Sequence, residues 1–166
     1  FEQNRVEPSY VALLVDTSMS MARRDCGARQ AGPTREHPST RLEAVREALA
    51  RDGGAPLRRL LERNALHLLT FSGSADRPAG TELRAVAATA EELSAVSSVL
   101  AILTPEGGTS DPARAIEQTI QSTQGRRLAA IVLAAVYRLV DVAALSRLWR
   151  VSRIDFYAAA IALVAV

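Results

Sequence analysis

The chain has 166 residues, 48% of them apolar and 23% charged, so we expect a single globular domain over residues 1–166. Its formal net charge is only +2, and its arginines are spread along the chain, which argues against a nucleic-acid-binding surface. All 20 basic residues are arginines, which excludes a phosphate-binding-loop lysine and Schiff-base chemistry.

Short apolar runs that suit buried strands alternate along the chain with segments of helical spacing. The strands are expected at residues 10–15, 65–71, 81–86, 128–134 and 154–161. The helices are expected at residues 39–51, 55–64, 90–102, from 111 onward and at 142–150. Turn residues between 71 and 81 allow the second and third strands to pair as a hairpin. This alternation predicts an α/β fold, a doubly wound and mostly parallel sheet with helices on both faces.

Two helix starts carry clear signals. Ser39 or Thr40 can cap the first helix, and Asp111 precedes a proline at the first helical position of a later one. The last forty residues are less clear, because residues 126–166 contain neither glycine nor proline. Residues 128–150 therefore also fit one continuous buried helix. The final apolar stretch is too short to span a membrane.

Asp16, Ser18 and Ser20 stand at alternate positions directly after the first apolar run. In an open parallel sheet, ligands bind beyond the carboxyl ends of the strands, so these three side chains can point at one spot. A carboxylate and two hydroxyls are hard oxygen ligands, which suit Mg²⁺, Mn²⁺ or Ca²⁺. The same residues would also suit a simple turn.

Four stretches of the chain resemble the von Willebrand factor type A family. The run VALLVDTSMSM resembles its Asp-x-Ser-x-Ser motif, PEGGTSDPARAI its glycine-flanked threonine loop, LHLLTFSGSA its second strand and RLEAVREAL its first helix. The resemblance implies a Rossmann-like domain with a metal-ion-dependent adhesion site formed by Asp16, Ser18, Ser20 and Thr109. It also implies a non-enzymatic module in which an Asp or Glu of a protein partner completes the shell of Mg²⁺, Mn²⁺ or Ca²⁺.

The chain departs from this family pattern after the strand expected at residues 128–134. Ala135, Val136 and Tyr137 stand where the family has threonine, aspartate and glycine, and the nearest acid, Asp141, suits a helix cap. The family's last strand and helix are also missing, which indicates a truncated C-terminus. With one carboxylate lost, we expect a shallow, solvent-open site that binds its cation weakly.

Three alternative functions explain less of the sequence than a metal-dependent binding module does. A structural domain that has lost the ion is the main alternative. A haloacid-dehalogenase-like phosphatase would need a second aspartate where Ser18 stands, and a serine hydrolase would need a Gly-x-Ser-x-Gly turn. Cys26 is the only cysteine, and it is interpreted as a spare cysteine in a polar loop, with a reactive thiol as the alternative. His37 and His67 are interpreted as structural residues. We expect no enzymatic activity.

Overall fold

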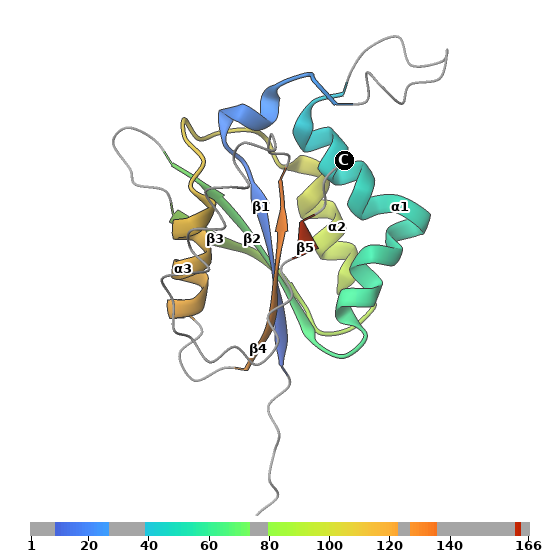
Figure 1. The fold of residues 1–166 in the computed structure, drawn as a ribbon. Coiled ribbons are helices and arrows are strands. Elements are labelled where there is room, and N and C mark those ends of the chain that lie inside the picture. The colour runs from blue at the N-terminus through green and yellow to red at the C-terminus, as the bar shows by residue number, and fades with distance from the viewer. Residues whose placement is uncertain (1–8, 27–38, 74–79, 123–126, 136–161, 164–166) are drawn as a thin grey trace, which may run out of the picture.

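The computed structural model describes residues 9–26, 39–73, 80–122, 127–135 and 162–163, and these are built around one mixed sheet (Figure 1). Its strand order is β3-β2-β1-β4-β5. The strands are β1 (Tyr10–Asp16), β2 (Ala65–Ser72), β3 (Gly80–Ala87), β4 (Leu128–Ala134) and β5 (Ala162–Leu163). Strand β1 runs parallel to β2 and β4, β5 runs parallel to β4, and β3 is antiparallel to β2. The α/β class is confirmed, but the sheet is not parallel throughout, so the doubly wound description holds only in part.

Helices cover both faces of this sheet (Figure 1). They are α1 (Arg41–Leu61), α2 (Leu93–Ile102) and α3 (Pro112–Ser122), and a short 3-10 helix, η1 (Met19–Ala22), follows β1. Helices α1 and α2 lie on one face and α3 on the other. Because side chains alternate along a strand, Leu13 packs in the core under α1 and α2, whereas Leu14 packs in the core under α3.

The two expected helix starts are confirmed. Thr40 caps α1 in a capping box, in which its hydroxyl accepts from the backbone N–H of Glu43 and the Glu43 carboxylate accepts from the backbone N–H of Thr40. The Asp111 carboxylate accepts from the backbone N–H of Arg114 at 3.0 Å, just before α3 begins at Pro112. Both caps satisfy N–H groups that the first helical turn leaves without a partner.

Helix α1 is interrupted near its middle, as the paired glycines of the sequence indicate. Arg51 has extended backbone angles, and the three residues that follow, Asp52, Gly53 and Gly54, all have positive φ. The guanidinium of Arg58 donates to the carbonyl oxygens of Gly53 and Asp52 and so holds this turn. The expectation of two helical pieces is therefore confirmed.

The C-terminal part of the chain decides between the two interpretations left open by the sequence. Residues Leu128–Ala134 form a strand paired with β1, so one continuous helix over residues 128–150 is wrong. The helix expected at 142–150 and the strand expected at 154–161 lie outside the described residues. The expected hairpin is confirmed in the antiparallel pairing of β2 with β3. Among the described residues, no helix is long and apolar enough to cross a membrane.

Candidate functional site

The carboxyl end of β1 is joined to two loops that come from distant parts of the sequence. Ser18 forms an isolated parallel bridge with Gly107, and Gly73 forms an antiparallel bridge with Thr109. Two backbone hydrogen bonds, of 2.9 and 3.0 Å, connect Gly73 with Thr109 in both directions. The loop after β2 and the loop before α3 are therefore held against the end of β1, on a frame of backbone hydrogen bonds.

Asp16 lies at the centre of this frame and is fully buried, with 0% of its surface exposed. Its Oδ1 accepts from the backbone N–H of Ser18 at 2.8 Å, and its Oδ2 accepts from the hydroxyl of Ser110 at 2.7 Å. Buried carboxylates need such donors, because removing a charge from water is costly without them. The expected shallow, solvent-open site is wrong for this residue, since the loops cover it.

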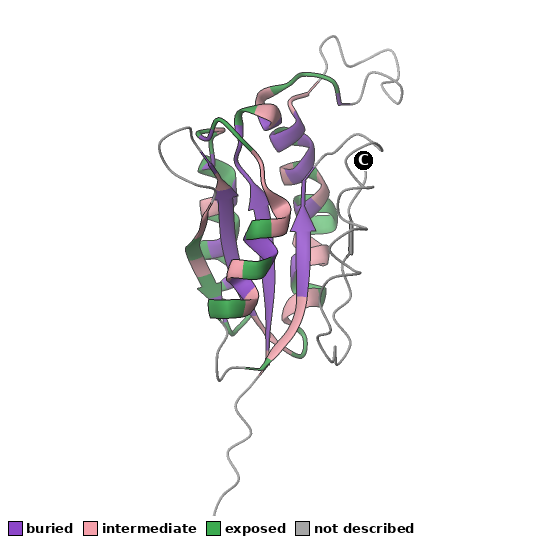
Figure 2. Cartoon of the chain, turned by 60° about the vertical axis from the view of Figure 1, so that its left-hand side comes forward, coloured by how far each residue is buried: buried purple, intermediate pink, exposed green. Residues whose placement is uncertain are grey.

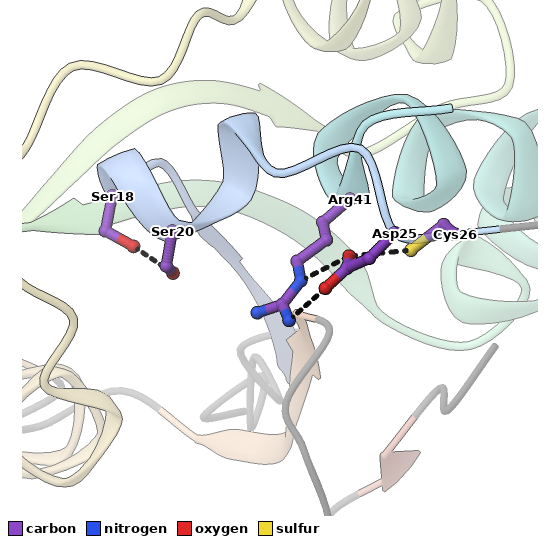
Figure 3. A network of polar contacts seen from close by, with 5 residues as sticks. All are labelled: Ser18, Ser20, Asp25, Cys26 and Arg41. Atoms are coloured by element: carbon purple, nitrogen blue, oxygen red, sulfur yellow. Dashed lines mark hydrogen bonds and ion pairs between the residues drawn. The ribbon is translucent and has the colours of Figure 1, made fainter. Parts of the chain in front are cut away.

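The two serines of the alternating motif lie together, as the sequence predicts. The hydroxyl oxygens of Ser18 and Ser20 are 2.9 Å apart, within hydrogen-bonding distance, and Figure 3 shows the two side chains pointing toward one another. Ser18 is fully buried and Ser20 is half-buried. These hydroxyls therefore face each other at the end of β1.

The loop before α3 reaches Asp16 through a residue that the sequence analysis did not select. Thr109 is exposed, and its backbone pairs with Gly73, whereas the adjacent Ser110 donates its hydroxyl to the Asp16 carboxylate. The structure thus brings together Asp16, Ser18, Ser20 and Ser110, and it places the Thr109 backbone at the same edge. The available signal was a second hydroxyl directly after Thr109, but the sequence does not say which of the two turns inward.

The oxygen cluster differs from the metal centre that the sequence resemblance implied. It contains one carboxylate, both of whose oxygens already accept hydrogen bonds. In the part of the chain that the structure describes, no three His, Cys, Asp or Glu residues are grouped where they could hold a metal ion. The prediction of a metal-ion-dependent adhesion site of the family type is therefore wrong here. Val136, Tyr137 and Asp141 lie outside the described residues.

Asp25, Cys26 and Arg41 form a second polar contact, close to η1 (Figure 3). The Arg41 guanidinium donates to both Asp25 carboxylate oxygens, at 2.8 and 2.6 Å, and this hydrogen bonding lowers the pKa of Asp25. Burial raises the pKa of the Cys26 thiol, which keeps the thiol protonated and poorly nucleophilic. The group therefore joins the segment after η1 to the start of α1.

The structural interpretation of the histidine in β2 also fits its surroundings. The ring of His67 stacks on the ring of Tyr10 in the neighbouring strand, with centroids 4.3 Å apart and an interplanar angle of 24°. His37 lies outside the described residues. The stacked pair lies near the start of β1, at the opposite end of that strand from Asp16.

Comparison with known proteins gives a likeness of fold. No family model matches the chain, and no curated protein matches it. Among solved structures, the chain is similar to the PilB minor pilin from Streptococcus sanguinis, with a TM-score of 0.51 and 18% sequence identity over 80% of this chain. A point mutant of the same pilin gives a TM-score of 0.46 and 16% identity over 82% of this chain. The chain spans 30% and 31% of those two pilin chains.

These findings correct the family assignment. The chain resembles a minor pilin structure, and no family model supports membership of the von Willebrand factor type A family, so that assignment is wrong. The short motifs that suggested it describe a local arrangement of polar residues after a strand. At 18% identity the pilin likeness extends to the fold alone.

Proposed function

We propose that the chain is a non-enzymatic protein-recognition module that binds its partner at the carboxyl edge of the sheet. The observation that carries the proposal is the frame at the end of β1, where loops from two distant parts of the chain hold Asp16, Ser18 and Ser110 together. Rigid loop ends of this kind suit recognition, because little further ordering is needed when a partner binds. For the fold, we propose the doubly wound arrangement. Helices on both faces of the sheet support it, although the antiparallel strand β3 departs from it.

The hydrogen bonds at this edge support recognition without chemistry. A serine nucleophile needs a general base at its hydroxyl, whereas the Ser18 hydroxyl pairs with the Ser20 hydroxyl. A nucleophilic or basic aspartate needs an accessible oxygen, whereas Asp16 is fully buried and its oxygens accept from Ser18 and Ser110. The proposed role of the carboxyl end of β1 is therefore to bind a protein partner without making or breaking a covalent bond.

The proposal includes a weakly held divalent cation, Mg²⁺ or alternatively Mn²⁺ or Ca²⁺, at Asp16, Ser18, Ser20 and Thr109, with the buried Asp16 carboxylate acting on the ion from behind its Ser18 and Ser110 donors rather than as a direct ligand. Hard oxygen donors suit these ions, and a single carboxylate with neutral hydroxyls leaves most of the shell to water. An Asp or Glu of a protein partner would replace one of those waters and add negative charge. Ser110 would orient the Asp16 carboxylate through its hydrogen bond.

Calorimetric titration with Mg²⁺ and Mn²⁺ tests the cation part of the proposal. We expect a dissociation constant on the order of 1 mM or weaker for the parent chain, and no detectable heat for Asp16→Asn, which keeps the shape but removes the charge. Glu91→Gln removes one charge from an exposed position and is the matched control. Equal absence of binding in all three proteins would favour the structural-domain alternative.

The same variants test the enzymatic alternative. Hydrolysis of p-nitrophenyl phosphate by the parent chain, with loss of activity in Asp16→Asn alone, would contradict the recognition proposal and favour a phosphatase. We expect no hydrolysis above that of buffer in any of the three proteins, because the Asp16 oxygens are enclosed and already hydrogen-bonded.

A further inference from the structure

A polar pocket of about 450 Å³ opens beside the oxygen cluster, between the hairpin of β2 and β3 and the loop before α3. Its volume lies within the range of about 300–1,000 Å³ that is usual for ligand sites. Side chains with hydroxyl or charged groups and three glycines line it: Thr70, Ser72, Gly73, Gly80, Thr81, Glu82, Arg84, Glu106 and Gly107. Such a lining suits a polar or charged group rather than an apolar one.

The wall formed by Glu106 and Gly107 is held in place by backbone contacts. The backbone N–H groups of both residues donate to the carbonyl oxygen of Thr17, at 2.8 and 3.2 Å. Gly107 also lies so close to Ser72 that an added Cβ would stand 2.2 Å from the Ser72 Cβ. The pocket is therefore formed before any ligand arrives, which reduces the entropic cost of binding.

The charges of the pocket do not cancel. Arg84 lies in an ion pair with Glu82, with 3.0 Å between guanidinium nitrogen and carboxylate oxygen, and its Nε donates to the buried Thr70 hydroxyl at 3.0 Å. Glu106 is exposed and accepts from the Thr104 hydroxyl at 2.9 Å, and it forms no ion pair with any residue that the structure describes. Among the lining residues that the structure describes, Glu82 and Arg84 neutralise one another, so Glu106 carries the remaining negative charge.

We infer that this pocket receives a basic side chain, arginine or lysine, of the protein partner. The inference rests on the proposed function, since it concerns the same edge of the sheet and names the chemistry of the partner. The incoming cation would pair with the Glu106 carboxylate, while the hydroxyls of Ser72 and Thr81 offer further acceptors. A partner that fits this site therefore presents a basic residue to the pocket, beside the Asp or Glu that it presents to the oxygen cluster.

Titration of the ¹⁵N-labelled chain with N-acetyl-arginine methylamide, followed by NMR, tests this inference. We expect saturable shifts of the Gly73, Gly80 and Gly107 amide signals, and much smaller shifts with the citrulline analogue, which has a similar shape but no charge. In Glu106→Gln the dissociation constant should rise by about threefold or more, because an exposed ion pair contributes modestly. Glu91→Gln loses the same charge far from the pocket and should bind as the parent does.

Two results would overturn the inference. One is equal binding of the arginine and citrulline compounds, and the other is an unchanged dissociation constant in Glu106→Gln. Asp16→Asn separates this test from that of the proposed function, because it removes the carboxylate charge of the oxygen cluster and replaces no residue that lines the pocket. Arginine binding that persists in Asp16→Asn supports the pocket even if no cation binds. Cation binding without arginine binding supports the proposed function and contradicts the inference.

Discussion

Strands β1 and β3 belong to the same sheet but contribute to the molecule in opposite ways. Every residue of β1 is buried, whereas β3 lies at the edge of the sheet and exposes half of its residues (Figure 2). Leu13 of β1 has 0% of its surface exposed, and Leu83 of β3 has 54%. The two strands differ because β1 has a strand on each side and helices over both faces, while β3 has one strand neighbour.

This difference divides the candidate site into a rigid part and a charged part. Strand β1 ends in Asp16, whose position is determined by neighbours on every side. Strand β3 supplies Glu82 and Arg84 to the neighbouring pocket, and the pairing of β2 with β3 shifts register at Arg84. Charges and a register shift are features that protect edge strands from pairing with other chains. The edge strand therefore presents charged side chains at the surface, whereas every residue of the central strand is buried.

The largest effect is expected from a leucine-to-alanine substitution in β1, and the same substitution in β3 is its comparison. Leu13→Ala should lower the free energy of unfolding by about 3–5 kcal/mol, because it leaves a cavity in a fully buried position. Leu83→Ala should lower it by less than about 1 kcal/mol, since the side chain is more than half exposed. Urea denaturation of both variants measures the difference. Similar losses in the two strands would contradict the division between centre and edge.

The next effect concerns Gly107, which connects the two parts of the site. Gly107→Ala should cost about 1–3 kcal/mol of unfolding free energy, because the new Cβ meets the Ser72 Cβ at 2.2 Å and the Ser72 Oγ at 2.6 Å. Ser72→Gly removes both of these atoms, so the double variant should recover part of the loss. A double-mutant cycle in urea isolates this coupling. Strictly additive losses would mean that the loop moves away without strain.

Much of this fold could be predicted from the sequence, because its central strands are continuous apolar runs and helices α1 and α3 begin at clear caps. The interruption of α1 was visible at Gly53 and Gly54. The register shift at Arg84 was not, since it depends on which residues of β2 lie opposite β3. The choice between strand and helix at residues 128–134 was also left open, because it is decided by pairing with β1 and not by local composition.

The candidate site could be predicted only in its local part. The proximity of Asp16, Ser18 and Ser20 is local, because the Asp16 carboxylate accepts from the Ser18 backbone N–H two residues on and the first turn of η1 brings Ser20 next to Ser18. The burial of Asp16 and its bond with Ser110 depend on loops more than fifty residues away, which no local pattern specifies. The family assignment failed for a related reason, since short motifs recur wherever a polar turn follows a buried strand.

A smaller effect is expected at the start of α1, the helix that covers one face of β1. Thr40→Ala removes the hydroxyl that accepts from the Glu43 N–H, so the free energy of unfolding should fall by about 1 kcal/mol. Thr40→Ser keeps a hydroxyl at the cap and should lose only a few tenths of that amount. Thermal unfolding followed by circular dichroism compares the three proteins. An equal loss in both variants would show that the threonine methyl, and not the cap, is responsible.

The smallest effect is expected at Asp25, which follows η1 and has 39% of its side chain exposed. Hydrogen bonding to Arg41 lowers the pKa of Asp25 from its ordinary value of 3.8, so the native state favours the charged form. A group whose pKa is lowered on folding contributes stability above its unfolded pKa and loses it as pH falls through the folded value. Asp25→Asn should therefore reduce the free energy of unfolding at pH 7 by about 0.5 kcal/mol, as for an exposed pair.

The same argument determines how this difference should depend on pH and salt. Parent and Asp25→Asn should converge in stability as pH is lowered below 3.8, because the parent carboxylate then becomes protonated and, like the asparagine, carries no charge. Added salt at pH 7 should also reduce the difference, since exposed charges are screened. Urea denaturation in a series from pH 7 down to pH 3, and at pH 7 with and without added salt, measures the two trends. A difference that stays constant over this range would mean that Asp25 acts through packing, and the periphery would then resemble the centre more closely than β1 and β3 suggest.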